Sequence, residues 1–409
     1  MRKFLLLAFR NVFRNRRRTL LTLVVVAGGV AGLLLVGGFF AQMFMGLRES
    51  TIRNGLGHLQ IYNADHLRRD ETRALEYGID DWRQIASLVT GLPHVRGATP
   101  RVEFSGLVSN GMKSSVFMGN AVDPSGERDM GFAPSLTAGR DLDGVSAAGN
   151  EALLGAGLAR SLNVKVGDGL TLLAVTANGA LNGIDIDVVG IVTTGFKEMD
   201  DRLLRITVPA AQRLLETPRV TKLVVGLDDT RHTDPVYEDL SLRTAGLRQE
   251  IATKKWIELA TFYRQVRVLF SGIFVFLGVI VLFMVVMSSA NTLLMSLFER
   301  TREIGTMLAM GTPRSWIVGL FVLEAVITGA GGALAGVIAG NLLGALLNRA
   351  NLQLPPPPGN TASMAFRVLH EPALMVGASV LVVLTLALAS VLPAIRASRL
   401  QIAEALAHI

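Results

Sequence analysis

The sequence of 409 residues contains no cysteine. A disulfide, a thiolate nucleophile and a Cys-ligated metal are therefore excluded. The histidines are few and scattered, and they form neither an H-E-x-x-H motif nor another paired spacing that binds zinc. We predict no metal site and no cofactor bound directly to this chain. The six positions are His58, His66, His94, His232, His370 and His408.

The chain also lacks the sequence motifs of common enzymes. No G-x-x-x-x-G-K-S/T string is present, so the backbone cradle and the lysine that hold nucleotide phosphates are missing. The segment Gly111–Ser114 lacks the two glycines of that loop and is predicted to be a turn. No G-x-S-x-G nucleophile elbow occurs. The chain is therefore not an ATPase, and we expect no catalytic residue in it.

The positive charge of the chain is unevenly placed. The formal net charge is +7, and seven of the 40 Lys and Arg residues lie in the first eighteen positions, directly before an uncharged run. That placement is typical of a segment that contacts lipid headgroups, and it argues against a nucleic-acid partner. The seven residues are Arg2, Lys3, Arg10, Arg14, Arg16, Arg17 and Arg18.

Four apolar segments dominate the sequence, whose mean hydropathy is +0.43. Each is longer than the roughly 20 residues that a membrane-spanning helix needs. The first is too long for the hydrophobic region of a cleaved signal peptide, about 7–15 residues, so we interpret it as an uncleaved anchor. The sequence predicts an α-helical membrane protein with four transmembrane helices, at 19–47, 268–298, 315–347 and 372–395.

The arginines beside these segments predict the orientation of the chain. Basic residues are frequent in the N-terminal helix, in the loop between the second and third spans and in the tail. In the last loop, by contrast, Arg367 is the only Lys or Arg residue between Ala350 and Glu371. Because basic flanks remain in the cytoplasm, both termini are expected there. The predicted cytoplasmic segments are 1–18, 299–314 and 396–409, and the predicted extracytoplasmic ones are 48–267 and 348–371.

The long insert, residues 48–267, is predicted to be a large α+β extracytoplasmic domain. Its middle, about 114–205, is rich in glycine and in alternating patterns, which favours a strand-rich subdomain. Helical pattern from Leu247 to Phe298 predicts a long stalk helix of about 75 Å leading into the second span. The expected helices are 80–90, 210–216 and 247–267, and the expected strands are 169–175, 184–192, 204–208 and 222–227.

Glu324 is the only acidic residue within a predicted span. A charge at that depth is costly and indicates a function by default. A proton relay needs a second titratable group in another span, and none is present. We therefore predict a structural or coupling role near the cytoplasmic interface, with a bond to Ser288, Ser289 or Asn291.

Glycines in two spans recur every four residues and predict close helix packing. The third span carries Gly332, Gly336, Gly340 and Gly344, and the first carries Gly28 and Gly32. Packing within one chain is favoured over a seam between two copies, although such patches serve both purposes.

The segment 299–314 predicts a short amphipathic helix on the cytoplasmic side, because Ile304, Met307 and Met310 can share one face and Gly311 suits a helix end. Its sequence ERTREIGTMLAMGT resembles the coupling region of the FtsX-like, MacB-like permeases of ABC transporters. Weaker resemblances lie at 8–19, 155–168, 188–195 and 393–406. Within that superfamily the chain resembles the lipoprotein-releasing LolC/LolE type, which has no fused ATPase.

This resemblance implies a transport subunit of the bacterial inner membrane rather than an enzyme. Two copies of a cytoplasmic ABC ATPase would bind ATP and Mg²⁺, and a second permease subunit would complete a homodimer or related heterodimer. ATP-driven closure would then move the periplasmic domain, a scheme called mechanotransmission. The implied ATPase contacts are Glu299, Arg300, Arg302, Glu303, Ile304, Met307, Met310 and Gly311.

The resemblance leaves two functions open. A transporter would export or extract a lipoprotein or another amphipathic substrate, with a periplasmic adaptor or a lipoprotein carrier as a further partner and membrane lipid around it. A signalling protein of the FtsX-like kind would instead activate a cell-wall hydrolase without transport. The extracytoplasmic domain is larger than signalling members usually have, which favours transport.

Overall fold

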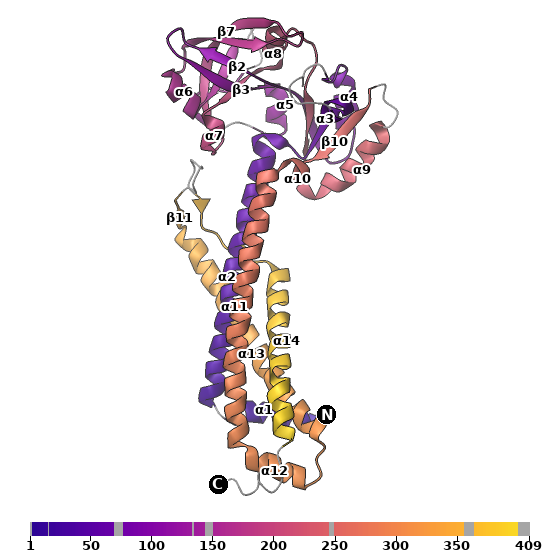
Figure 1. Ribbon diagram of the computed structural model, residues 1–409, viewed down its shortest axis with the longest axis vertical. Coiled ribbons are helices and arrows are strands. Elements are labelled where there is room, and N and C mark those ends of the chain that lie inside the picture. Colours follow the sequence, from indigo (N-terminus) through magenta and orange to yellow (C-terminus); the bar gives the residue numbers. More distant parts are fainter. Residues whose placement is uncertain are drawn as a thin grey trace. The chain divides into compact units, whose positions relative to one another are not determined.

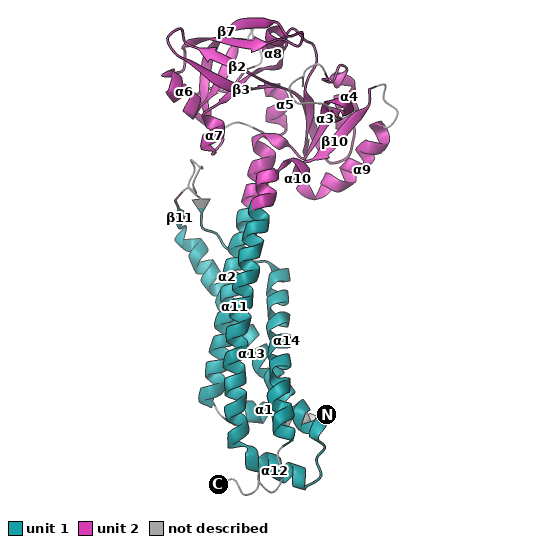
Figure 2. Cartoon of the chain, viewed as in Figure 1, with its two compact units in different colours: residues 1–45, 266–354, 365–409 teal, residues 46–265, 355–364 magenta. Residues whose placement is uncertain are grey.

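The computed structural model describes residues 2–14, 16–68, 77–132, 135–143, 150–244, 249–355 and 364–399. The chain forms two compact units (Figure 2), which we call the membrane unit (1–45, 266–354 and 365–409) and the sheet unit (46–265 and 355–364). The predicted tail beyond Arg399 and the proline run after Pro355 lie outside the described residues.

The membrane unit is helical. Among the described residues, four helices are long and apolar enough to cross a membrane, which confirms the four predicted spans. The short α12 connects two of them (Figure 1). The bounds are α1 Arg2–Arg14, α2 Arg16–Thr51, α11 Thr261–Glu299, α12 Thr301–Ala309, α13 Arg314–Ala350 and α14 Pro372–Ser398, with the paired β11 Gln353–Leu354 and β12 Met364–Ala365 between the last two.

Small residues let α13 approach α2 closely in the membrane unit. A Cβ added at Gly336 would lie 2.7 Å from the Ala27 carbonyl oxygen, and Gly332 and Gly340 also face α2. Nothing lies within 4 Å of a Cβ placed at Gly28 or Gly32. The predicted packing role of those two glycines is therefore wrong within this chain, because they point away from the described neighbours of α2. In α2 it is the adjacent Gly29 that lies close to α11.

Gly336→Ala is expected to lower the stability of the chain by about 1–3 kcal/mol, because the new methyl group overlaps a backbone carbonyl that has no room to move. Gly32→Ala is the matched control. With open space around its Cβ, it is expected to be neutral or to stabilise the helix by up to about 1 kcal/mol. Thermal unfolding of both variants in the same detergent measures the difference. Equal melting temperatures would contradict the packing described here.

The sheet unit is built from ten described strands that form one hydrogen-bonded sheet. Its strands are β1 Leu59–Asn63, β2 Val95–Ser109, β3 Ser114–Val122, β4 Ser135–Gly139, β5 Glu151–Gly155, β6 Gly169–Val175, β7 Leu181–Thr193, β8 Leu203–Thr207, β9 Lys222–Leu227 and β10 Ile251–Lys255. Its helices are η1 Ile52–Leu56, α3 Ala64–Arg68, α4 Trp82–Thr90, α5 Pro124–Asp129, α6 Ala156–Leu162, α7 Lys197–Asp200, α8 Val208–Leu215, η3 Thr230–His232, α9 Thr233–Thr244 and α10 Trp256–Leu259.

Six of these strands close on themselves. β2 pairs with β3, and the path continues through β8, β5 and β7 to β6, which pairs again with β2. Alternate residues of β6, such as Leu170, Leu172 and Ala174, are buried inside this closed sheet. We call it the barrel. It contains most of the strand-rich region predicted at 114–205, together with the second half of β2.

The first half of β2 belongs to a second, antiparallel layer. Residues 95–101 of β2 pair with β9, which pairs with β1, which in turn pairs with β10. In Figure 1 this layer, marked by β10, α4 and α9, lies apart from the barrel strands labelled β3 and β7. All six residues of β9 are buried, as expected for a central strand. Arg101 lies where β2 changes partners, since it is opposite Lys222 of β9 and Val122 of β3.

The predicted helix 247–267 is wrong before Trp256, where the described residues 249–255 are not helical. Residues 251–255 form the edge strand β10, residues 256–259 form the short α10, and α11 begins only at Thr261. The helical pattern is overruled because β1 offers an unpaired edge, and Ile251–Lys255 hydrogen bonds along it. The 39 residues of α11 correspond to about 58 Å of helix, shorter than the stalk predicted from the sequence.

Candidate functional site

A short helix between two spans forms the centre of the candidate site. α12 begins after Arg300, whose backbone breaks the path of α11 with φ −107° and ψ 12°. It ends in a turn at Gly311, where φ is +85°, a conformation that glycine adopts at little cost. Pro313 then precedes α13. The local sequence thus sets both ends of the helix and reverses the chain between spans.

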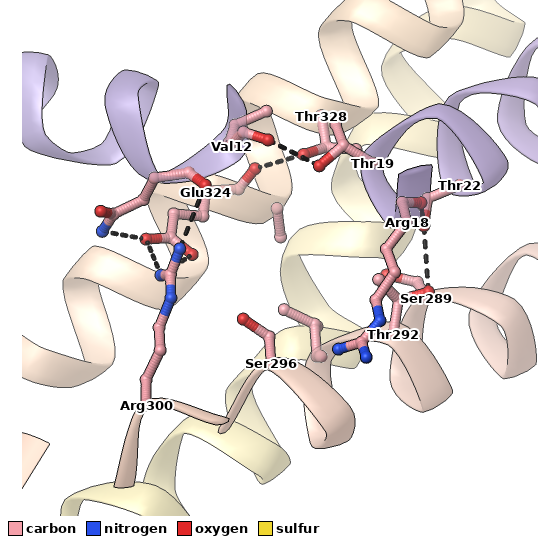
Figure 3. Close-up of a pocket in the computed structure, with 13 residues that line it drawn as sticks. Val12, Arg18, Thr19, Thr22, Ser289, Thr292, Ser296, Arg300, Glu324 and Thr328 are labelled. Atoms are coloured by element: carbon pink, nitrogen blue, oxygen red, sulfur yellow. Dashed lines mark hydrogen bonds and ion pairs between the residues drawn. The ribbon is translucent and has the colours of Figure 1, made fainter. Parts of the chain in front are cut away.

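A buried ion pair lies beneath this helix (Figure 3). The Arg300 Nη1 atom is 3.0 Å from Glu324 Oε1 and 3.2 Å from Oε2. Only 6% of the Arg300 side chain and 8% of the Glu324 side chain are exposed. Ionised groups this deeply buried are stable only when they are paired, so each residue requires the other.

The N-terminal helix completes the same cluster. The Asn11 side chain donates a hydrogen bond of 2.6 Å to Glu324 Oε1, and the Arg300 Nη2 atom donates one of 3.1 Å to the Asn11 carbonyl. α1, the start of α12 and α13 therefore meet at one point, which we call the junction. A cavity of about 60 Å³ adjoins it and is lined also by Thr22, Ser289 and Thr292.

Two further ion pairs join the basic N-terminal region to the segment around α12. Arg14 lies 2.7 Å from Glu303, and Arg18 lies 2.5 Å from Glu299. The hydrogen bond to Glu303 raises the pKa of the Arg14 guanidinium above its ordinary value. About half of each side chain in the Arg14 pair is exposed, so that pair contributes at most about 1 kcal/mol. These outer pairs orient α1 against α12, whereas the buried pair fixes the junction.

The residues predicted to contact a partner divide into two groups. Arg302, Glu303 and Met310 are exposed, the last by 74%, as are Glu299 and Gly311. Met307 is half-buried. Ile304 is 1% exposed in an apolar cluster with Ile317 and Phe321. Arg300 and Ile304 face the interior of this chain, so their predicted role as surface contacts is corrected to one of positioning α12.

The partner predicted for Glu324 is also corrected. The carboxylate bonds to Arg300 and Asn11, and not to Ser288, Ser289 or Asn291. A lone acid inside a span signals that a cation must be near, and Arg300 follows the last residue of α11. The sequence could therefore have predicted a cationic partner for Glu324. It could not predict that the chain reverses through α12 and thereby places Arg300 against α13.

A second cavity, of about 680 Å³, lies within the sheet unit. Its lining combines apolar side chains with Arg101, Glu103 and Lys222, and Lys222 Nζ lies 2.6 Å from Glu103 Oε1. Burial lowers the pKa of Lys222. An apolar cavity with a few fixed charges is suited to an amphipathic ligand. The apolar members are Leu56, Phe196, Met199, Leu259, Ala260, Phe262 and Tyr263.

Two family models match most of the chain. Residues 19–241 match the MacB-like periplasmic core domain, and residues 275–402 match the FtsX-like permease C-terminal domain. The first match covers most of α2 and most of the sheet unit, whereas the second begins within α11 and covers the later helices of the membrane unit.

Similar proteins carry transport names. The chain is 24% identical to the lipoprotein-releasing system transmembrane protein LolE of Haemophilus influenzae, over 78% of this chain and 74% of that protein. It is 26% identical to the macrolide export ATP-binding/permease protein MacB of Sodalis glossinidius, over 85% of this chain and 53% of that protein. The crystal structure of the periplasmic region of MacB from Actinobacillus actinomycetemcomitans aligns with a TM-score of 0.37 and 14% identity, over 52% of this chain and 94% of that one.

Proposed function

Because this chain belongs to the family of permeases with a MacB-like periplasmic core domain and an FtsX-like C-terminal domain, we propose that it couples ATP hydrolysis by a separate ABC ATPase to movement of its periplasmic domain. It is an inner-membrane protein whose sheet unit is the periplasmic domain. In this proposal both termini and α12 are cytoplasmic, as the basic flanks predict. The chain itself is a transport subunit and not an enzyme.

The proposed assembly contains two ATPase copies, which bind ATP and Mg²⁺, and a second permease subunit, identical or related. The absence of a nucleotide-binding loop in these 409 residues supports a separate ATPase. The name of the relative MacB, an ATP-binding/permease protein, supports an ATPase as part of the assembly. A periplasmic adaptor or lipoprotein carrier is the proposed receiver of the substrate.

The proposed substrate is a lipoprotein or another amphipathic molecule, taken from the membrane. The name of the LolE relative supports lipoprotein release. The 680 Å³ cavity of the sheet unit supports it independently, because its lining offers aromatic surface for an apolar group and the Glu103–Lys222 ion pair, whose carboxylate is half exposed, for a polar one. Purification of the complex in nanodiscs, followed by identification of bound lipid or lipoprotein and its effect on ATP hydrolysis, tests this assignment.

The exposed side of α12 is the proposed contact with the ATPase. One observation carries this assignment. α12 and the Met310 residue that follows it expose Arg302, Glu303 and Met310, while the buried Arg300–Glu324 pair and Ile304 hold the helix from within. A helix held in this way can transmit force, because its position cannot change without disturbing the junction. Exposed apolar and arginine side chains are also the usual anchors of protein interfaces.

Met310→Asp is expected to weaken binding of the ATPase at least about tenfold, because it places a charge where an apolar anchor is proposed to be buried. The measurement is the affinity between the full chain in nanodiscs and its ATPase, with stimulated ATP hydrolysis as a second readout. Met112→Asp makes the same substitution at a position of the sheet unit that is 90% exposed, and it should change neither. Unaltered ATPase binding by Met310→Asp would contradict the proposed contact.

A second candidate function is transmembrane signalling to a cell-wall hydrolase. The match of residues 275–402 to the FtsX-like permease domain supports it. Proteoliposomes that contain the complex distinguish the two functions. Transport predicts ATP-dependent release of a lipidated substrate to a soluble acceptor, whereas signalling predicts ATP hydrolysis with no release and activation of a hydrolase added outside.

A further inference from the structure

Three side chains of the sheet unit converge on one point. The Nδ1 atom of His94 lies 2.9 Å from Asp228 Oδ2, and the Nδ1 atom of His232 lies 2.7 Å from Asp228 Oδ1. The two imidazole rings stack with their centres 3.7 Å apart. One ligand atom from each of the three residues lies within 4.8 Å of the others. Two imidazoles and a carboxylate thus share one small volume.

The fold of the sheet unit explains this convergence. His94 directly precedes β2 and Asp228 directly follows β9, and these strands pair with Val95 opposite Leu227. The Asp228 amide donates a hydrogen bond of 3.1 Å to the His94 carbonyl, which fixes the two backbones. His232 ends η3, one helical turn after Asp228. The cluster is not visible in the sequence, because His94 and Asp228 are 134 residues apart in the chain.

The backbone at His94 has a positive φ angle. Its φ is +66°, in the left-handed region that side chains other than glycine rarely adopt. Such a conformation persists only when its surroundings impose it, and it often accompanies a functional position. Here it turns the imidazole toward Asp228 and His232. The distorted backbone and the meeting of the three side chains are separate observations that point to the same place.

We propose that His94, Asp228 and His232 bind one divalent transition-metal ion, with Zn²⁺ the best fit. Imidazole and carboxylate are ordinary zinc ligands at about 2.0–2.2 Å, and a tetrahedral site with three protein ligands leaves the fourth position to water. The ligand atoms need only small movements to reach this geometry, and the three side chains are 32–46% exposed, so they can make them. This proposal revises the sequence-based expectation that the chain has no metal site.

The proposed ion would fasten three segments of the sheet unit together. It would join the entry to β2, the exit from β9 and the turn that leads into α9. Two of these segments are already paired through the sheet, whereas η3 and α9 follow a bend of the chain. Metal binding is therefore expected to stabilise the α9 end of the domain, because a ligand that binds only the folded state shifts the unfolding equilibrium.

Zinc binding to the full chain tests the proposal. The protein is purified in detergent with an affinity tag that contains no histidine, stripped with a chelator, and titrated with Zn²⁺ against a chromophoric chelator. We expect one Zn²⁺ per chain at micromolar affinity or tighter, and a rise in melting temperature on addition of Zn²⁺. Co²⁺ should give the visible absorption of a tetrahedral site.

Variants decide whether these three residues are the ligands. His94→Ala and His232→Ala are each expected to weaken Zn²⁺ binding at least tenfold and to abolish the rise in melting temperature. His66→Ala replaces another histidine of the same unit and should leave both the Zn²⁺ affinity and the rise in melting temperature unchanged. Asp228→Asn keeps the size of the side chain and removes its charge, and it should also weaken binding. The proposal is overturned if the parent binds no Zn²⁺, or if the His94 and His232 variants bind it as tightly as His66→Ala does.

Discussion

Glu324→Ala is expected to abolish the proposed coupling of ATP hydrolysis to transport and to destabilise the membrane unit by about 3–5 kcal/mol. The substitution leaves the Arg300 guanidinium buried without a counter-charge, since Glu324 is the acidic side chain with which it pairs. It also removes the acceptor of the Asn11 side-chain hydrogen bond. Both losses occur where α1, α12 and α13 meet, so the exposed face of α12 should lose its fixed position.

The double variant Arg300→Met with Glu324→Met separates stability from coupling. Replacing a buried pair by apolar side chains of similar size is often neutral or stabilising, so the double variant is expected to fold. If the pair transmits force, stimulated ATP hydrolysis and substrate release should remain lost although the protein is stable. Full recovery of both activities would assign the pair a purely structural role.

Two single variants complete this test. Glu324→Gln keeps the shape of the side chain and removes its charge, and unchanged coupled hydrolysis and transport in this variant would remove Glu324 from the mechanism. Arg14→Met breaks an ion pair that is half exposed, so its stability should change by at most about 1 kcal/mol. The measurements are thermal unfolding in nanodiscs and ATP hydrolysis by the assembled complex.

The predictions were confirmed where the local sequence is compatible with only one secondary structure. Long apolar runs predicted the four spans, because a chain in lipid must satisfy its backbone hydrogen bonds within each helix. The predicted strands 169–175 and 222–227 coincide with β6 and β9. Alternation along β6 and a short apolar run in β9 are local signals, and turns bound both strands.

The predictions were wrong where contacts with a distant part of the chain decide the secondary structure or the burial of a residue. The helical pattern after Leu247 is local, but residues 251–255 become a strand because β1, far away in the chain, offers its edge. In the same way, Arg300 carries a charge in a motif that resembles a contact surface, yet the return of α13 buries it against Glu324. Pattern alone does not reveal which of several nearby charges faces inward.

Glu127→Gln is expected to destabilise the sheet unit by about 3–5 kcal/mol. The Glu127 carboxylate accepts hydrogen bonds of 2.8 and 2.9 Å from the Arg101 guanidinium and one of 3.1 Å from Arg205. The side chains of Arg101 and Glu127 are 1% and 5% exposed, and that of Arg205 is 11% exposed. Burial lowers the pKa of Arg205, and the charge of Glu127 opposes that shift. A neutral amide would leave two buried guanidinium groups without a counter-charge.

The position of this cluster makes the effect more than local. Arg101 lies where β2 passes from the antiparallel layer to the barrel, Glu127 comes from α5, and Arg205 comes from the barrel strand β8. Arg101 also donates to the Gly55 carbonyl of η1, the segment that follows α2 in the chain. The cluster thus ties η1, the antiparallel layer and the barrel together within the sheet unit, and a movement of η1 would reach the barrel through Arg101.

Unfolding of the full chain in nanodiscs measures this prediction, with Asp201→Asn as the control. Asp201 pairs with Lys197 at the surface, where the two side chains are 39% and 64% exposed, so its loss should cost at most about 1 kcal/mol. If the cluster also carries movement, Glu127→Gln should reduce substrate release more than it reduces stimulated ATP hydrolysis, because the substitution leaves the proposed ATPase contact on α12 unchanged. A stability equal to that of Asp201→Asn would show that Glu127 does not hold the two parts of the sheet together.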